Sequence, residues 1–479
     1  MKALWTLLLI VVLVSAAAAQ PQPPVIEWSR TYGSDSSDSN ISGALPTSDG
    51  GYMLCGSVLP YGAAVLSDML LMRTNAVGDC VWSETYGGIS YEVCTAMLAT
   101  TDGGLVLAGY RMSENTVGFD FMLLKTDAQG DCLWSHTYGR DGHDICNAVQ
   151  PTPDGGYLLA GATDATPFSC GWLVKTDANG DSLWSRLYGG DGHSEFLCVR
   201  QTVDQNFVLA GRISYDDLWV MKIDQSGDSL WSRAYGGTGG LEVEGGESVR
   251  QTADGGFVVA GWKLQETLEE DFWLVKTDAN GDSLWSRAYG GENSRDECYD
   301  VMETEDGGYV LIGQTTQTGV WSLDGLVIRT NADGDSLWSL RLGDANRNVF
   351  TTGLRTADGG FVFGGTTATD FFSQSWLVKT GPELLAGETP VARSVCLLSN
   401  YPNPFNPTTT LSFSLPRTSQ VTIRAYDILG REVELIVNTV YPAGAHTVAW
   451  TPWKRASGTY LISLTGDGFH MVRKTILLR

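Results

Sequence analysis

The residues best suited to chemistry are two histidines in equivalent loops of a repeated sequence. His143 lies in the stretch RDGHD and His193 in GDGHSE, and each is followed by an acid, Asp144 or Glu195. Imidazole beside carboxylate is typical of metal ligation and of acid–base catalysis. Two exposed loops in similar repeats would show the same pattern. The chain has five histidines and neither a GxSxG nor an HExxH motif, so no established catalytic set accompanies them.

A second group contains aromatic and basic side chains from loops that differ between repeats: Tyr110, Arg212, Trp262 and Trp321. Aromatic rings with a few polar groups suit sugars or peptides. For any one of these residues, packing against a neighbouring loop is the alternative. Together with the two histidine–acid pairs, these residues form the predicted ligand-binding set. We predict no catalytic residue, no metal ligand and no cofactor.

The acidic turns resemble half of a calcium-binding loop but lack its other half. In TDANGD, Asp177 and Asp181 flank Gly180. A true loop has more widely spaced ligands and a later bidentate Glu, so we expect plain turns here. No CxxC spacing occurs either, which leaves a structural zinc site without support.

The candidate residues are positioned by a sequence that repeats seven times. Each repeat contains an Asp-Gly-Gly turn, a WLVKTD-like run and a Trp-Ser pair, always in the same order. The turn is degenerate at Asp204 and otherwise begins at Asp49, Asp102, Asp154, Asp254, Asp306 and Asp358. A period of about fifty residues with strand-like content indicates a propeller blade or a solenoid coil.

Each repeat reads as four short strands bounded by Gly and Asp turns, which is the content of a propeller blade. The tight TADGG and TDANGD turns lie at one end of the blade because the strands alternate in direction. The other two connections are long and differ in every repeat. We therefore expect function on this variable-loop face.

The start of the repeat array supplies the type of strand that its last repeat lacks. A lone fourth-type strand at residues 25–32 precedes the first full repeat, and the last repeat stops after its third strand at residues 375–380. We expect these strands to pair antiparallel and close a seven-bladed ring over residues 25–380. Trp28 should then occupy the same slot between blades as Trp82 or Trp285.

One motif in the repeats resembles a known family. The pattern D-x-x-G-x-x-x-W, as in Asp127, Gly130 and Trp134, is similar to the blade motif of quinoprotein-like (PQQ-type) propellers. The resemblance implies the fold, with the Trp packed between neighbouring blades. It implies little about chemistry, because the adjacent Cys-Cys pair and calcium cage of quinone-dependent dehydrogenases are not visible here.

The first 19 residues have the features of a secretory signal peptide. Lys2 precedes an apolar stretch, and Ala17-Ala18-Ala19 forms an A-x-A cleavage site. An uncleaved membrane anchor is the alternative. We expect no membrane span after cleavage. The net charge of −24 argues against nucleic-acid binding and favours a monomeric exported protein.

The nine cysteines do not form a compact disulfide pattern. Cys94, Cys146 and Cys298 occupy one repeat position that is Ile or Phe in other repeats. We therefore expect buried free thiols that act as small apolar side chains.

After a linker at residues 381–394 the repeat stops and short alternating segments predict a small β-sandwich. Residues 395–479 resemble the type A sorting domain of type IX secretion, which is related to the Ig-like domain of the flagellar hook-capping protein. The resemblance rests on motif residues Asn400, Pro402, Asn403, Pro404, Phe405, Asn406, Pro407, Gly430, Gly458 and Lys474. It implies recognition by the secretion machinery and delivery to the outside or the cell surface. An Ig-like module without a sorting role is the alternative.

Two functions remain open from sequence. The first is a non-enzymatic exported propeller that binds a glycan or a protein. The second is an extracellular hydrolase or lyase acting on a polymer. Carboxylates or histidines clustered at the mouth of the central channel would favour the enzyme.

Overall fold

The computed structural model shows an all-β protein, and no helix, membrane-spanning or otherwise, occurs in the part of the chain that it describes. The described residues are 21–34, 36–60, 66–113, 117–165, 168–189, 192–214, 217–236, 244–264, 269–291, 294–317, 322–343, 347–368, 372–383, 396–401, 405–415, 418–442, 444–453, 455–466 and 469–477. The predicted signal peptide lies outside them.

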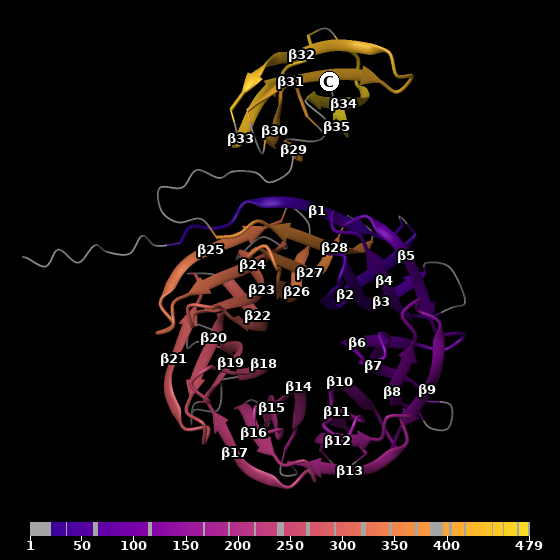
Figure 1. Ribbon diagram of the computed structural model, residues 1–479, viewed down its shortest axis with the longest axis vertical. Coiled ribbons are helices and arrows are strands. Elements are labelled where there is room, and N and C mark those ends of the chain that lie inside the picture. The colour runs from indigo at the N-terminus through magenta and orange to yellow at the C-terminus, as the bar shows by residue number, and fades with distance from the viewer. Residues whose placement is uncertain are drawn as a thin grey trace, which may run out of the picture.

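Within these residues the repeats form seven four-stranded antiparallel sheets around a common centre, a propeller-like arrangement (Figure 1). The strands nearest the centre are β2 (Ser37–Pro46), β6 (Glu92–Ala99), β10 (Asp144–Pro151), β14 (Glu195–Gln201), β18 (Glu244–Gln251), β22 (Ser294–Glu303) and β26 (Asn348–Arg355). The second strands are β3 (Tyr52–Pro60), β7 (Leu105–Met112), β11 (Tyr157–Thr163), β15 (Phe207–Ile213), β19 (Phe257–Leu264), β23 (Tyr309–Gln317) and β27 (Phe361–Ala368).

The outer half of each sheet contains a third and a fourth strand. The third strands are β4 (Asp68–Thr74), β8 (Phe119–Thr126), β12 (Cys170–Thr176), β16 (Asp217–Ile223), β20 (Glu270–Thr277), β24 (Leu323–Thr330) and β28 (Ser373–Thr380). The fourth strands are β1 (Ile26–Tyr32), β5 (Cys80–Tyr86), β9 (Cys132–Tyr138), β13 (Ser182–Tyr188), β17 (Ser229–Tyr235), β21 (Ser283–Tyr289) and β25 (Ser336–Leu342).

The pairing of the two ends of the array is confirmed. β1 pairs antiparallel with β28, with Trp28 opposite Lys379 and Tyr32 opposite Ser375. The resulting sheet contacts the first complete sheet, β2 to β5, through β2. One apolar cluster joins them, with Trp28 and Ile41 packed among Val362 and Leu377. The first and last repeats are therefore neighbours in space.

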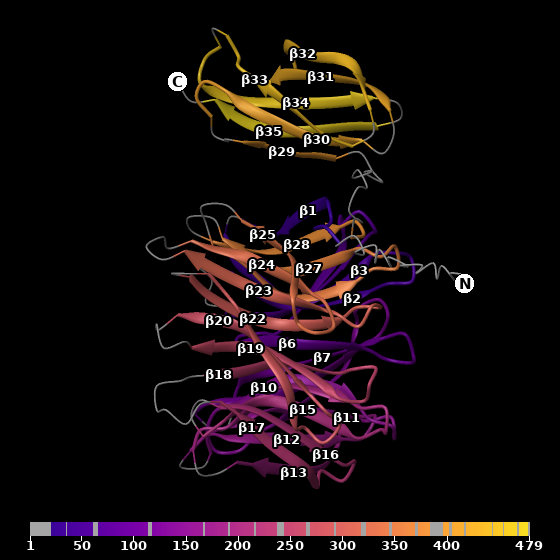
Figure 2. The same ribbon diagram turned by 90° about the vertical axis from the view of Figure 1, so that its left-hand side faces the viewer.

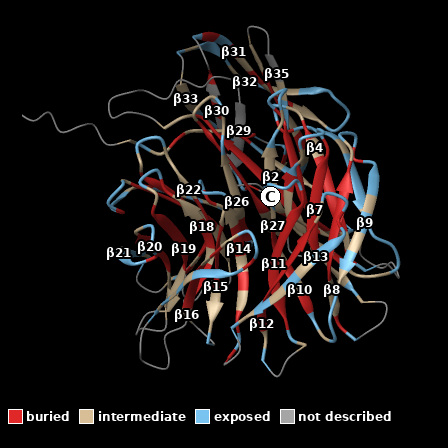
Figure 3. Ribbon diagram, turned by 60° about the horizontal axis from the view of Figure 1, so that its bottom comes forward, coloured by how far each residue is buried: buried red, intermediate tan, exposed pale blue. Residues whose placement is uncertain are grey.

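Burial follows the order of the strands within each sheet. The second and third strands are buried on both faces because a neighbouring sheet covers each face, and β11 and β12 are buried along their whole length. The outermost strands alternate between half-buried and exposed residues (Figure 3). A period-2 pattern of this kind is typical of a strand with one solvated side.

A repeated contact holds adjacent sheets together. In six of the seven fourth strands the Trp packs on the hairpin Gly of the next sheet, so that a Cβ on Gly78 would lie 2.6 Å from the Trp28 ring and one on Gly130 3.0 Å from the Trp82 ring. Gly78 has φ +79°, which also favours glycine. Four residues after the Trp, a tyrosine hydroxyl donates to the same Gly carbonyl, as from Tyr32 to Gly78 at 2.7 Å. Trp28 thus occupies the expected slot.

The face with the tight turns is structural. At each Asp-Gly-Gly turn the Asp accepts a backbone N–H and pairs with a cation from the third strand, as Asp102 does with Gly104 N and with Lys125 at 2.7 Å. The same pair recurs as Asp49–Arg73, Asp154–Lys175, Asp204–Lys222, Asp254–Lys276, Asp306–Arg329 and Asp358–Lys379. The Lys276 ammonium and the Thr252 hydroxyl hold the pKa of Asp254 at about 2, against the effect of burial. These carboxylates are therefore committed to the fold.

Strands β29 to β35 form a second, smaller domain (Figure 2). β29 (Cys396–Tyr401), β30 (Thr409–Leu415) and β33 (Gly444–Trp450) make one sheet, and β31 (Ser419–Asp427), β32 (Glu432–Tyr441), β34 (Gly458–Gly466) and β35 (Phe469–Leu477) make the other. A single apolar core lies between the sheets and includes Phe405, Phe413, Ile423, Trp450 and Ile462.

The sorting-motif residues occupy the start and the turns of this domain. Phe405 is buried, packs on Trp450 with ring centroids 5.4 Å apart, and donates its backbone N–H to Ile476 O. Asn400 lies in β29, Asn406 and Pro407 follow Phe405, Gly430 lies in the turn before β32, Gly458 begins β34, and Lys474 is exposed on β35. Pro402, Asn403 and Pro404 lie outside the described residues.

Candidate functional site

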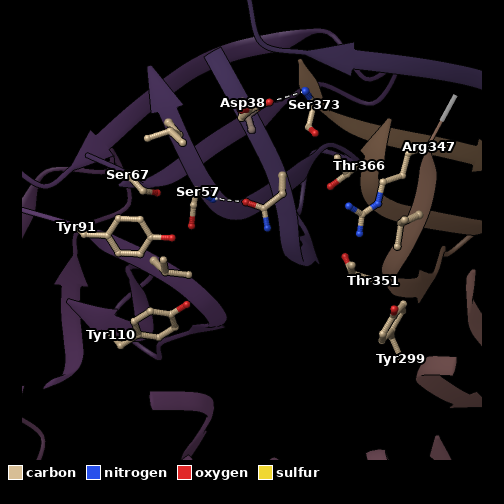
Figure 4. Close-up of a pocket in the computed structure, with 15 residues that line it drawn as sticks. Asp38, Ser57, Ser67, Tyr91, Tyr110, Tyr299, Arg347, Thr351, Thr366 and Ser373 are labelled. Atoms are coloured by element: carbon tan, nitrogen blue, oxygen red, sulfur yellow. Dashed lines mark hydrogen bonds between the residues drawn. The ribbon is translucent and has the colours of Figure 1, made fainter. Parts of the chain in front are cut away.

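A cavity of about 460 Å³ lies where the last, first and second sheets meet near the centre of the ring (Figure 4). The variable-loop ends of their strands supply most of its lining: Asp38, Ser39, Asn40, Ser57, Leu59, Ser67, Tyr91, Val93, Tyr110, Arg347, Val349, Thr351, Thr366 and Ser373. Tyr299 of β22 adds a side chain from a further sheet. The volume is typical of small-molecule sites.

Part of the polar lining is already bound to protein. Asn40 Oδ1 accepts the Ser57 N–H at 2.9 Å, and the Thr351 hydroxyl donates to Ile41 O at 2.6 Å. Asp38 Oδ1 accepts the Ser373 N–H at 2.6 Å. Ser39 accepts from Ser375 N, and the Tyr299 hydroxyl donates to Glu297. These groups shape the wall of the cavity.

Six further polar side chains of the lining have no hydrogen bond or ion pair with any residue that the structure describes: Ser67, Tyr91, Tyr110, Arg347, Thr366 and Ser373. Figure 4 shows the Tyr91 and Tyr110 hydroxyls and the Arg347 guanidinium pointing into the cavity. Polar groups inside proteins are normally partnered by protein or water. Five hydroxyls and one guanidinium therefore remain available to a ligand.

The two tyrosines are held by an aromatic cluster on the second sheet. Phe119 packs against Tyr91 at 5.7 Å, against Tyr110 at 5.3 Å and against His143 at 5.2 Å between ring centroids. Burial raises the pKa of Tyr110, and Tyr91 adds to the effect, so the hydroxyl stays protonated at neutral pH. Predicted residues Tyr110 and His143 are thus linked through Phe119, but only Tyr110 lines the cavity.

The rest of the two histidine–acid pairs does not enter the cavity. Asp144 is fully buried and accepts the Arg140 N–H at 2.6 Å, while burial raises its pKa. His193 is exposed, and its ring lies 6.3 Å from Phe168. No group of three His, Cys, Asp or Glu side chains suited to a metal ion occurs among the described residues.

Glu195, Arg212 and Trp262 form a separate cluster on the fourth and fifth sheets. Arg212 lies 2.8 Å from Glu247, 3.6 Å from Glu195 and 5.3 Å from the Trp262 ring. Burial raises the pKa of Glu247, and Arg212 opposes this shift. Both carboxylates of this cluster are thus paired with the one guanidinium. Trp321 lies outside the described residues.

A pair of acids, Asp68 of the first sheet and Glu92 of the second, lies close to Gly87. A Cβ on Gly87 would lie 1.9 Å from Asp68 Oδ1 and 2.9 Å from Glu92 Oε2, so both oxygens converge on this glycine. Within the described part of the chain neither oxygen has a hydrogen-bond partner. Burial raises the pKa of both carboxyls, and Arg111, 3.6 Å from Glu92, opposes the shift there.

Of the six polar side chains that are available to a ligand, only Tyr110 was predicted from the sequence. Ser67, Tyr91, Arg347 and Ser373 all lie at or beside the long variable connections, which is where function was expected. Serine and threonine are too common in loops to stand out by type. Only their position at the junction of the first and last repeats distinguishes them.

Comparison with known proteins identifies the C-terminal region. Residues 399–478 match the family model of the secretion system C-terminal sorting domain. The protein carries a type IX secretion sorting domain. It is therefore secreted or attached to the cell surface through type IX secretion, and its sorting domain interacts with that machinery. No curated protein matches the chain.

Solved structures show only remote likeness. A protein of unknown function from Dyadobacter fermentans is 11% identical over 76% of this chain and 98% of its own, with a TM-score of 0.42. Puromycin hydrolase is 13% identical over 78% of this chain and 55% of its own, with a TM-score of 0.42. PorZ, a surface component of the type IX secretion system of Porphyromonas gingivalis, is 9% identical over 92% and 81%, with a TM-score of 0.24. Likeness at this level carries no argument about function.

Proposed function

We propose that this exported protein is a non-enzymatic binding module whose ligand is a glycan. The seven sheets are the blades of a closed quinoprotein-like propeller, and the second domain is an Ig-like sandwich that delivers it. The observation that supports binding is the cavity with its six available polar side chains. Hydroxyls that donate and accept, beside tyrosine rings, match the alternating polar and apolar faces of a sugar.

The chemistry of the lining supports binding over hydrolysis. Among the described lining residues there is one carboxylate, Asp38, and no imidazole or thiol. Hydrolysis of a glycosidic bond ordinarily uses two carboxyl groups that flank it. Asp38 is further engaged through Oδ1 with the Ser373 N–H. A single engaged carboxylate suits orientation of a ligand.

A glycan array on the purified full-length protein, followed by calorimetry of the hits, tests this function. Tyr91→Phe and Tyr110→Phe remove hydroxyls that have no described protein partner, so the fold should be retained. Each should weaken binding about 3- to 10-fold, the value of one lost hydrogen bond. Tyr426→Phe, in the C-terminal domain, is the matched control and should bind normally.

Two results would contradict the proposal. One is a ligand whose affinity is unaffected by both tyrosine variants. The other is an array and calorimetry series in which no carbohydrate binds. Turnover of a bound glycan by the purified protein would point instead to the enzyme.

A further inference from the structure

Among the described residues the cavity lining contains one arginine, Arg347, that forms no ion pair, and this feature deepens the function proposed above. Arg347 lies just before β26 and is exposed. It lines the cavity together with Tyr299, whose hydroxyl is bound to Glu297; burial and the Glu297 charge raise the pKa of Tyr299, and the Arg347 charge opposes them. Within the described part of the chain, no carboxylate forms an ion pair with Arg347.

Four other arginines on the variable-loop face are paired with carboxylates, whereas Arg140, before β10, forms no ion pair with a described residue and does not line the cavity. Arg111 pairs with Glu92, Arg212 with Glu195 and Glu247, Arg295 with Glu270 and Glu297, and Arg341 with Asp324. In a chain with a net charge of −24, acids are abundant partners for any arginine. Arg347 therefore differs from these four arginines, because its guanidinium points into the cavity and forms no ion pair with a described residue.

The one carboxylate of the cavity does not neutralise this charge. Asp38 lies beside Ser373 in Figure 4 and accepts the Ser373 N–H through Oδ1, and it forms no ion pair with Arg347. The remaining available groups are uncharged hydroxyls. A guanidinium offers paired donors that match a carboxylate or sulfate, and such charge-assisted bonds are the strong ones in a partly enclosed site.

The available hydroxyls come from three sheets around the cavity that Arg347 enters. Tyr91 and Tyr110 stand on the second sheet, Ser67 on the first, and Thr366 and Ser373 on the last, beside Arg347. A ligand that reaches from Arg347 to the tyrosines thus needs an anion at one end and hydroxyls along the rest.

We propose that the ligand is an acidic sugar whose anionic group pairs with Arg347. Its ring hydroxyls bind the hydroxyls of Ser67, Thr366 and Ser373 and of Tyr91 and Tyr110, and its apolar face lies against the tyrosine rings. Carboxylated and sulfated glycans share this chemistry. The inference rests on the proposed glycan binding at the same cavity.

Calorimetry with three oligosaccharide series of matched length tests the proposal on the full chain. The series are oligogalacturonates, the same oligomers reduced at their carboxyl groups, and sulfated neutral oligomers. At least one anionic series should bind about 10- to 100-fold more tightly than the reduced series, the value of a charge-assisted hydrogen bond. The two anionic series distinguish a carboxylate from a sulfate ligand.

An arginine at each end of β26 gives a test variant, at Arg347, and a matched control, at Arg355. Arg347→Ala should remove the preference for the anion, and Arg347→Lys should restore part of it because the charge remains without the paired donors. Arg355→Ala, at the other end of β26, breaks an exposed ion pair with Glu305 and should leave binding unchanged. Thermal unfolding of each variant checks that the fold is retained.

The outcomes separate the two proposals. Equal binding of the anionic and reduced series, with no effect of Arg347→Ala, would overturn the acidic-sugar inference and leave glycan binding standing. Binding of none of the three series, together with a blank glycan array, would overturn both. An anion preference that survives Arg347→Ala would place the anion elsewhere and also refute the inference.

Discussion

The buried guanidinium of Arg329 lies 2.9 Å from the carboxylate of Glu383, three residues beyond the last strand of the ring. Glu383 also accepts the Trp338 indole N–H at 2.9 Å, and Arg329 binds Asp306. At this junction the preceding sheet carries Leu342 in place of the usual tyrosine. The start of the linker thus replaces a contact that other sheets make through their own side chains.

Glu383→Ala should lower the unfolding temperature, because it leaves a buried guanidinium with one carboxylate and an indole N–H without an acceptor. We expect a cost of about 1–3 kcal/mol from denaturant unfolding. Glu305→Ala is the control, because its ion pair with Arg355 is 84% exposed on the Glu305 side. Equal stability of both variants would refute the role of Glu383.

Deletion of the residues after Glu383 should leave a folded ring that no longer reaches the surface, because the sorting domain is lost. Cell fractionation and surface proteolysis measure this. A chain that ends at Thr380 should also be less stable than one that ends at Glu383. Normal surface levels of either truncated chain would contradict the sorting role.

Trp28→Ala should lower the free energy of unfolding by about 3–5 kcal/mol, because the Trp28 indole fills the space between the sheet that contains β1 and Gly78 of the next sheet. Trp28 is 7% exposed, whereas Trp453 is 76% exposed and serves as the control. Chemical denaturation of both variants gives the two values. If Trp28→Ala lowers the free energy of unfolding no more than Trp453→Ala does, β1 does not stabilise the packing of the last sheet on the first.

Thiol labelling should divide the cysteines by burial. Cys80 and Cys132 are exposed and should react in the native protein. Cys94, Cys146 and Cys298 are fully buried free thiols, and burial raises the pKa of Cys146 to about 12, so these three should react only on unfolding. Peptide mapping under non-reducing conditions checks this, and a native disulfide at any of the three would contradict it.

The two acids at Gly87 predict that Asp68→Asn stabilises the folded protein by an amount that depends on pH. Because burial raises the folded-state pKa of Asp68, its contribution to stability is present below the unfolded value of about 4 and is lost as the pH rises through the folded value. Asp68→Asn is neutral at every pH and can donate to Glu92 Oε2. It should therefore unfold at a higher temperature than the wild type at pH 7, with the gap closing toward pH 4.

Asp102→Asn is a control in which the change in stability at neutral pH should have the opposite sign. The hydrogen bond from Lys125 lowers the pKa of Asp102, so its contribution is present at neutral pH and lost in acid. This variant should be less stable than the wild type at pH 7 and similar to it at low pH. Thermal unfolding at both pH values checks the signs, and a pH-independent effect of Asp68→Asn would exclude the proposed cause.

Sequence by itself determined the repeating architecture of this protein. The lone fourth-type strand expected at residues 25–32 is observed at Ile26–Tyr32. The pairing of β1 with β28 was also predicted, from the lone strand before the first full repeat and the missing fourth strand of the last repeat. Such features depend on alternation and turn residues within one repeat, which are local properties of the chain.

Only the tertiary structure decided which loops meet. Tyr110 was predicted as a ligand residue and lines the cavity, but Arg212 and Trp262 belong to another cluster in which the charges are already paired. Arg347 and Ser67 are distant in sequence and become neighbours of one cavity because β1 joins the last repeat to the first. Whether a polar side chain is available to a ligand depends on the partners that packing supplies, and those partners come from other repeats.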